Sequence, residues 1–311
     1  MQGLTIRPYT DADAAPVAEM MNKREVAFGG DPYFTSAELD DIAHGWARDA
    51  ATDSRLYVAP DGTVAAVLMV APPPDGGTQA DTFAGVHPDF VGRGIGRDLL
   101  TWAFERHAEL HAQLAPQVDW TVDVGSSIRD TRALWLFERF GMSPVRYFFE
   151  MVTDLANVPS VELPEGFRVV AYSDDMARAL YEADEEAFRD HWGHEDHPYD
   201  WWHALTVGSE LFRPEHSRIA YDGDEIAALV LAYDNGAGHH YIGQVATRRP
   251  WRKRGLASAL ISASVAAAAA DGKTVTSLGV DSENPNGALG VYERLGFAAR
   301  QRFVVYRKPL V

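Results

Sequence analysis

The chain has 311 residues, of which 46% are hydrophobic and 23% are charged, and its formal net charge at pH 7 is −17. This composition is typical of a soluble globular protein, and the length corresponds to about two domains. Because there is no cysteine, disulfides, thiolate metal sites and a cysteine nucleophile are excluded. No stretch approaches the ~20 apolar residues of a membrane span, and no signal-peptide pattern opens the chain. We expect a cytoplasmic protein without a membrane partner.

The acidic balance disfavours nonspecific binding of nucleic acid, so we expect no nucleic-acid partner. It is compatible with a cationic substrate. One short segment departs from the balance, because five of the seven residues 248–254 are basic: Arg248, Arg249, Arg252, Lys253 and Arg254. An anionic ligand would find a favourable local charge there.

The two halves of the sequence repeat each other in the same order. The matched pairs are residues 4–13 with 167–176, 54–70 with 217–233, 86–100 with 247–261, and 133–142 with 288–297. Repetition at nearly constant spacing indicates two copies of one supersecondary plan. We therefore expect an N-terminal domain at 1–150, a linker at 151–166 and a C-terminal domain at 167–311.

Each copy predicts the same elements in chain order. A short strand comes first, followed by a helical region over 11–50 or 174–210, and then a hairpin with its turn at Asp61-Gly62 or Asp222-Gly223. Another strand leads through a glycine-containing loop into a helix, and a further strand follows at 120–124 or 275–280. A short helix ends at Gly141 or Gly296, where a helix C-cap favours glycine, and a last strand closes the copy. This order predicts an α/β fold with a mixed sheet.

The loop before the second-copy helix has the character of a phosphate site. Small residues at Gly255 and Ala257 let backbone N–H groups approach a ligand, and the helix N-terminus adds partial positive charge. The glycine spacing does not match the dinucleotide-binding fingerprint, and no Gly-Lys-Ser/Thr follows as in a P-loop. A tight turn with incidental surface arginines remains the alternative.

Both copies resemble the GCN5-related N-acetyltransferase (GNAT) family. The pyrophosphate motif of that family, [QR]-x-x-G-x-[GA], is matched by Arg252, Gly255 and Ala257, and its later motif is matched by Asn284, Ala288, Tyr292, Glu293, Gly296 and Phe297. The resemblance implies two tandem GNAT-like domains, each a mixed, mostly antiparallel twisted sheet flanked by helices. Two parallel strands then splay apart, and acetyl-CoA lies between them as co-substrate.

The resemblance also implies roles for individual residues. Tyr292 would lie beside the CoA sulfur and stabilise the departing thiolate. The backbone of the preceding strand would bind pantetheine, the loop would bind the pyrophosphate, and two asparagines would cap the next helix and face the cofactor. These cofactor-binding residues are Val245, Ala246, Thr247, Arg252, Lys253, Arg254, Gly255, Leu256, Ala257, Asn284 and Asn286.

The first copy departs from the family pattern at two places. Phe137 stands where the motif has tyrosine, and Val91 stands where it has arginine or glutamine. We therefore expect the C-terminal domain to catalyse and the N-terminal domain to be catalytically degenerate. The first-copy loop still suits phosphate, so a second cofactor site is expected at Val86, Arg93, Gly94, Ile95 and Gly96.

The general base and the acceptor site are less defined. An alkyl amine is almost fully protonated at pH 7, so a base or a relay water is needed, and the candidates are His240, Asp281, Glu283 and His191. His191 and Trp192 fall in the region that lines the acceptor side in this family. His191, His194 and His197 recur every three residues, but Gly193 and Pro198 break a helical register, so no metal is expected.

The function expected from these features is transfer of an acetyl group from acetyl-CoA to a primary amine of a small molecule. The tandem architecture also resembles that of the mycothiol synthases, which acetylate a cysteinyl amine. A non-catalytic acyl-CoA-binding or sensing protein is the alternative. The acceptor and the oligomeric state stay open.

Overall fold

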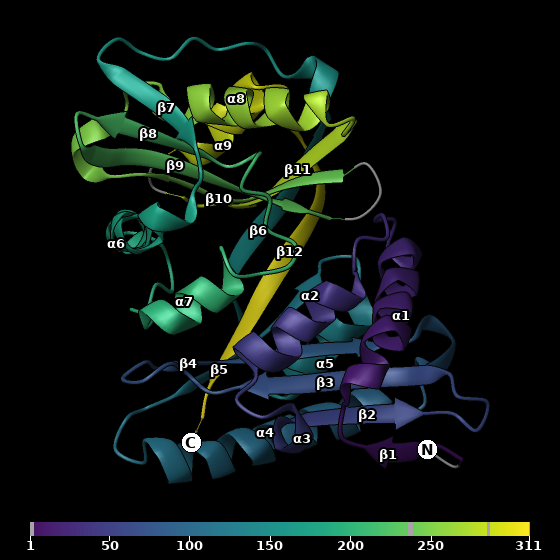
Figure 1. Ribbon diagram of the computed structural model, residues 1–311. Helices are drawn as coiled ribbons and strands as arrows, with labels where there is room; N and C mark the ends of the chain where they lie inside the picture. The colour runs from purple at the N-terminus through teal and green to yellow at the C-terminus, as the bar shows by residue number, and fades with distance from the viewer. Residues whose placement is uncertain (1–2, 236–238, 285–286, 311) are drawn as a thin grey trace. The chain divides into compact units, whose positions relative to one another are not determined.

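Helices and strands follow one another in the order that the repeat predicts. The computed structural model describes residues 3–235, 239–284 and 287–310 (Figure 1). Its residues group into two units: unit 1 comprises residues 1–147 and 302–311, and unit 2 comprises residues 148–301. Within the described residues, no helix is both long and apolar enough to cross a bilayer.

Unit 1 contains five helices and the strands of one mixed sheet among its described residues. The helices are α1 (Ala14–Ala27), α2 (Ser36–Asp41), α3 (Ala50–Asp53), α4 (Ile95–Leu114) and α5 (Thr131–Arg139). The strands are β1 (Thr5–Arg7), β2 (Ser54–Val58), β3 (Val64–Ala71), β4 (Gln79–Val86), β5 (Thr121–Ser127), the start of β6 (Ser143–Asp154) and most of β12 (Ala298–Pro309).

Unit 2 repeats this plan. Its helices are α6 (Ala177–Phe188), α7 (Tyr199–Leu205), α8 (Leu256–Ala270) and α9 (Ala288–Arg294). Its strands are β7 (Phe167–Ala171), β8 (Arg218–Asp222), β9 (Glu225–Asp234), β10 (His239–Thr247), β11 (Val275–Asp281) and the latter part of β6.

The strand order is β1-β2-β3-β4-β5-β12 in unit 1 and β7-β8-β9-β10-β11-β6 in unit 2. The pairs β4–β5 and β10–β11 are parallel, whereas the other pairs described within each unit are antiparallel. Side-chain alternation along β3 and β9 sends neighbouring apolar residues to opposite faces. Accordingly, α1 and α2 cover one face of the unit 1 sheet and α4 the other, while α6 and α7 are opposed by α8 and α9 in unit 2. The expected α/β architecture, with a mixed and mostly antiparallel sheet flanked by helices in each unit, is therefore confirmed.

The last strand of each sequence copy pairs with a strand of the other copy. Residues 303–309 of β12 pair with residues 121–127 of β5 in unit 1, and residues 148–154 of β6 pair with residues 275–281 of β11 in unit 2. The two spatial units therefore differ from the expected domains 1–150 and 167–311 at β6 and β12. Local strand pattern does not encode which sheet edge a strand joins, because any open edge offers the same hydrogen bonds.

The expected linker packs on unit 2. The hydroxyl of Ser262 on α8 donates to the carbonyl oxygen of Pro159 (3.0 Å) and accepts from the N–H of Val161 (3.0 Å). Val161 and Leu163 also pack against the apolar cluster under α8. The segment after β6 therefore follows α8 before β7 begins.

Candidate functional site

The basic loop of unit 2 turns sharply into α8. Lys253 and Gly255 both have positive φ angles, 63° and 85°, and Gly255 is the residue that precedes the helix. The first N–H groups of α8 have no helical acceptor, and with the helix dipole they favour an anion such as phosphate. Lysine at positive φ costs about 1 kcal/mol relative to its usual conformation, so the loop holds a strained residue where a ligand would bind.

Arg252 is the first residue of the phosphate motif, and its side chain contacts other residues of unit 2. Its guanidinium donates to the carbonyl oxygens of Thr247 (3.0 Å) and Ala187 (3.1 Å) and pairs with Asp190 at 2.7 Å. Hydrogen bonds from Arg249 and Arg252 hold the pKa of Asp190 well below its usual value. A phosphate at this loop would therefore share Arg252 with a carboxylate that is already paired.

Strands β10 and β11 separate next to the loop. Their parallel ladder joins residues 239–242 to 275–278, and the pairing of β10 with β9 is irregular between Ile242 and Gln244. Beyond that bulge, Val245, Ala246 and Thr247 stay paired with β9. Every second residue of an antiparallel strand directs its N–H and C=O away from that partner, so this stretch offers backbone groups on the side of β11.

Asn284, one of the two asparagines expected to cap the next helix, lies in the turn before α9. Its backbone carbonyl accepts from the N–H of Gly287 at 3.2 Å, and its backbone N–H donates to the carbonyl of Asp281 at 3.2 Å. Gly287, the residue that precedes α9, has a φ of 72°, a left-handed conformation that glycine adopts at no steric cost. The capping role of the asparagines stays a prediction. Asn286 lies outside the described residues.

Tyr292 lies on α9 and is 7% exposed. Burial and the neighbouring Tyr241 raise its pKa to about 12, and its ring lies 6.2 Å from that of Phe297. Its hydroxyl makes no hydrogen bond with the part of the chain that the structure describes. The phenol therefore stays protonated at physiological pH and keeps its donor for another group.

His191 and Trp192 follow α6 and lie beside the end of β11. The ring of His191 packs on Phe188 at 4.4 Å between centroids, and Trp192 packs on Phe148 of β6 at 6.3 Å. Partial burial lowers the pKa of His191, while the charge of Asp281 opposes that shift. His191 is therefore neutral at pH 7 and close to an acidic side chain, although the two residues are far apart in sequence.

The other expected bases differ in their surroundings. His240 is 0% exposed, hydrogen-bonds through its two ring nitrogens to Thr276 (3.0 Å) and Ser264 (3.3 Å), and has its pKa lowered to about 3 by burial. No substrate reaches such a group, so its position favours a role in the core. Asp281 is buried and accepts from the N–H of Glu283 at 2.9 Å, and Glu283 is exposed.

Histidines also meet carboxylates in unit 2. His194 lies 3.5 Å from Glu185 and 3.4 Å from Asp196, and His216 lies 2.9 Å from Asp271. The ligand atoms of Glu185, His194 and Asp196 lie within 4.8 Å of one another, as do those of Glu215, His216 and Asp271. Exposed carboxylates often gather in this way without an ion, and the expectation of no metal stays a prediction.

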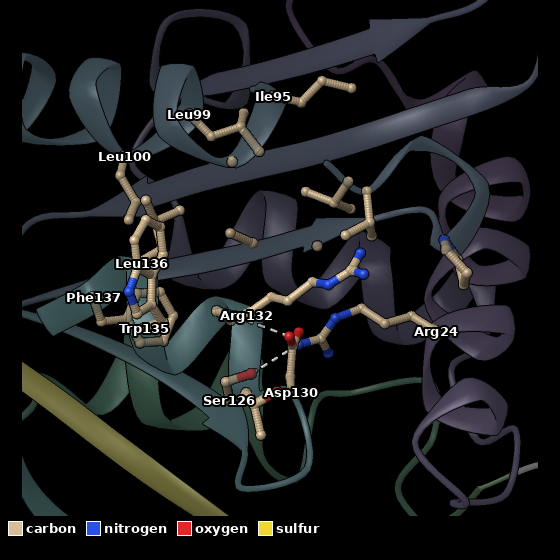
Figure 2. A pocket seen from close by; sticks show the side chains of 18 of the residues that line it. Arg24, Ile95, Leu99, Leu100, Ser126, Asp130, Arg132, Trp135, Leu136 and Phe137 are labelled. Atoms are coloured by element: carbon tan, nitrogen blue, oxygen red, sulfur yellow. Dashed lines mark hydrogen bonds and ion pairs between the residues drawn. The ribbon is translucent and has the colours of Figure 1, made fainter. Parts of the chain in front are cut away.

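Unit 1 contains a cavity of about 850 Å³ at the corresponding place (Figure 2). Its loop has the same backbone as that of unit 2, with Gly92 and Gly94 both at φ of 85°. Strands β4 and β5 pair only over residues 79–82 and 121–124, so they also separate beside the loop. The volume falls in the range of pockets that bind small molecules.

Four of the five residues expected for the second cofactor site line this cavity, namely Val86, Gly94, Ile95 and Gly96. Arg93 is not among the residues that line it. It donates to the carbonyl oxygen of Asp89 (2.9 Å) and lies 4.6 Å from the ring centre of Phe90. The positive charge of the cavity comes from four other arginines that line it, namely Arg24, Arg97, Arg129 and Arg132.

A buried ion-pair network crosses one end of the cavity. Arg24 of α1 donates to Ser126 of β5 (2.9 Å), pairs with Asp130 (3.2 Å) and pairs with Glu25 (3.1 Å), as Figure 2 shows for the first two. Phe137, the counterpart of Tyr292, lines the cavity and packs 5.4 Å from Tyr306. Sequence reasoning gave no signal for Arg24, because no motif contains it and its partners Ser126 and Asp130 lie more than 100 residues away.

Comparisons with known proteins agree with this geometry. The profile of the Acetyltransferase (GNAT) family matches residues 18–142 and 177–297. A GCN5-related N-acetyltransferase from Sphaerobacter thermophilus is 30% identical, with a TM-score of 0.81, over 100% of this chain and 96% of that one. A tandem GNAT protein from the clavulanic acid biosynthesis pathway is 18% identical, with a TM-score of 0.73, over 99% of each chain. A search of curated protein sequences gave no match.

A more distant structure has the same fold. N-myristoyltransferase from Saccharomyces cerevisiae, solved with bound myristoyl-CoA, is 10% identical with a TM-score of 0.67 over 99% of this chain and 80% of that one. The family profile covers most of both halves, and the 30% identical structure covers the whole chain. The chain therefore belongs to the GNAT family of acetyltransferases.

Proposed function

We propose that the chain transfers an acetyl group from acetyl-CoA to a primary amine of a small molecule, and that unit 2 performs the reaction. Support comes from the phosphate-type loop before α8, the separation of β10 from β11, and Tyr292 on α9. Tyr292 carries the proposal, because its counterpart in unit 1 is Phe137, which has no hydroxyl.

In this reaction the amine nitrogen attacks the thioester carbon, the C–S bond breaks, and CoA leaves as a thiolate. A thiol has a pKa near 8.5, so complete proton transfer from Tyr292, with its pKa of about 12, is uphill by about 5 kcal/mol. Tyr292 therefore acts as a hydrogen-bond donor that stabilises charge developing on sulfur. The thiolate takes up a proton afterwards.

The attacking amine must first lose a proton, because an alkyl ammonium has a pKa near 10.4. His191 is the base we assign, since it is half-buried and neutral at pH 7. Residues 245–247 would bind the pantetheine arm and residues 252–257 the pyrophosphate. Trp192 would form part of the acceptor wall.

Release of free CoA thiol from acetyl-CoA tests the proposal across small amines, a cysteinyl amine and peptide N-termini. Tyr292→Phe should lower kcat by about 10²-fold with little change in KM for acetyl-CoA, because the phenol acts on the leaving sulfur. Tyr221→Phe, a phenol removed from β8 of the same unit, is the matched control. An unchanged kcat in Tyr292→Phe, together with a raised kcat in Phe137→Tyr, would assign catalysis to unit 1 instead.

The second candidate function is binding of acyl-CoA without catalysis. The features of unit 1 favour this function for unit 1. Its cavity keeps the loop geometry, while Phe137 lacks the donor and Arg24 spans one end. Thiol release from no amine, with CoA still bound, would extend this second function to the whole chain.

A further inference from the structure

We propose that Trp135 is the adenine-stacking residue of a nucleotide site in the unit 1 cavity, so that unit 1 grips CoA by its adenosine diphosphate end. This inference rests on the proposed use of CoA and specifies which end of it unit 1 recognises. The ligand chemistry is a purine that carries phosphates.

The first observation is the exposure of Trp135 in the cavity wall. Its side chain is 56% exposed, whereas Leu99 and Leu100, two aliphatic residues that line the same cavity, are 2% and 4% exposed. Figure 2 shows the indole at the same end of the cavity as Leu100 and Leu136. The guanidinium carbon of Arg139 lies 5.6 Å from the centre of the Trp135 ring, so a planar base would stack on the part of the indole that stays exposed in the cavity wall.

The second observation is the positive charge in the same cavity. Arg132 precedes Trp135 by three residues on α5, and Figure 2 shows its side chain extending across the cavity toward the side of Arg24. Arg97 lines the same cavity from the first turn of α4. Neither guanidinium forms an ion pair with the described residues. Two cations, an aromatic ring and a phosphate-type loop that line one cavity match a nucleotide with several phosphates.

The third observation is that unit 2 lacks this apparatus. In the repeat, Gly290 replaces Trp135 and Ser258 replaces Arg97. The pattern is reversed at the reacting end, where unit 2 has Tyr292 and unit 1 has Phe137. The Arg24 bridge to Ser126 and Asp130 also fills space beside β5 in unit 1. The two units thus differ in which end of CoA their side chains serve.

Binding to the full-length protein tests this inference. The probes are CoA, adenosine 3′,5′-bisphosphate and 4′-phosphopantetheine, followed by calorimetry and by tryptophan fluorescence. We expect calorimetry to show two classes of CoA site. We also expect CoA and the bisphosphate to quench the fluorescence of the Trp135 indole. Trp135→Ala should weaken one class for both nucleotide probes by about tenfold, the size expected for loss of one base–aromatic stack, and should leave phosphopantetheine binding unchanged.

Two further variants separate stacking from structure. Trp135→Phe keeps a ring and should bind the nucleotides within about threefold of wild type, but it should abolish the quenching. Trp102→Phe removes an indole of α4 that does not line the cavity and should retain the quenching. An affinity of Trp135→Ala within twofold of wild type, or quenching that survives in Trp135→Phe, would overturn the inference.

The outcome is independent of the proposed transferase activity. If the wild-type protein releases thiol but Trp135→Ala binds nucleotides normally, the activity stands and this inference fails. If Trp135→Ala loses one class of nucleotide site and no amine supports thiol release, this inference stands and the transferase proposal fails.

Discussion

At the scale of single residues, His191 combines the properties that a general base needs at neutral pH. Partial burial lowers its pKa below the usual 6.5, so the neutral imidazole predominates at pH 7. The rate should therefore be constant above pH 7 and fall as the pH drops through the lowered pKa, because protonated imidazole cannot accept a proton. His191→Gln should lower kcat by about 10²-fold and should remove that acidic limb from the pH profile.

The control for this prediction is His44→Gln, which removes an exposed imidazole of unit 1 paired with Asp11. It should keep both the rate and the acidic limb. An acidic limb that persists in His191→Gln would show that another group supplies the base, and the buried Asp281 beside it would be the next candidate.

The sequence predicted some of these residues and not others, for a physical reason. Tyr292 and the loop at 252–257 belong to short motifs, which their neighbours along the chain are enough to identify. The approach of His191 to Asp281, and of Arg24 to Asp130, depends on how a helix packs on a distant strand. Side-chain type at one position carries no information about such a partner. The sequence likewise gave no reason to exclude His240, whose burial follows from the tertiary core.

At the scale of elements, the two phosphate-type loops have the same backbone but different residues at its strained point. Gly92 occupies the left-handed position in unit 1 at no cost, whereas Lys253 occupies it in unit 2 at φ of 63°. Lys253→Gly should raise the free energy of unfolding of unit 2 by about 1 kcal/mol. It should also weaken CoA binding, because the loop loses a cation.

The reciprocal change is Gly92→Ala in unit 1. No atom lies within 4 Å of a Cβ at Gly92, so the cost comes from φ alone, and stability should fall by about 1 kcal/mol. Gly125→Ala is the control, because it has equal space and no positive φ. Denaturant unfolding measures all three variants. A Gly92→Ala variant as stable as Gly125→Ala would contradict this account of the loop.

At the scale of the whole molecule, the exchange of last strands makes each unit depend on residues from the other half of the sequence. Residues 1–157 produced alone lack the segment 303–309 that pairs with β5, and residues 158–311 lack the part of β6 that pairs with β11. Each half should therefore expose an unpaired sheet edge and aggregate. Co-expression of the two halves should restore a folded protein, as measured by cooperative thermal unfolding.

A rearranged chain supplies the control. Residues 1–147 joined through a short glycine–serine linker to 302–311 contain every segment of unit 1 and should unfold cooperatively by themselves. Residues 1–157 folding alone with the stability of this rearranged chain would contradict the exchange.

The repeat predicted the tandem α/β fold and the order of elements, because these follow from local hydrophobic pattern and turn residues. The separation of the parallel strands was implied by the resemblance to the GNAT family. The repeat did not predict the exchange, since β6 and β12 are alike in pattern and either could complete either sheet. It also assigned 151–166 to a linker, whereas Ser262 and the apolar cluster under α8 hold that segment on unit 2. Which sheet edge a strand joins, and which surface a segment packs on, depends on tertiary contacts and not on the local sequence pattern.

The central claim is that unit 2 presents the thioester of acetyl-CoA to Tyr292, and a crystal structure of the protein with CoA tests it most directly. The account predicts a diphosphate on the backbone N–H groups of 253–257, the pantetheine arm between β10 and β11, and the sulfur within hydrogen-bond distance of the Tyr292 hydroxyl. Density for CoA that leaves this loop empty, with the Tyr292 hydroxyl remote from any sulfur, would contradict it.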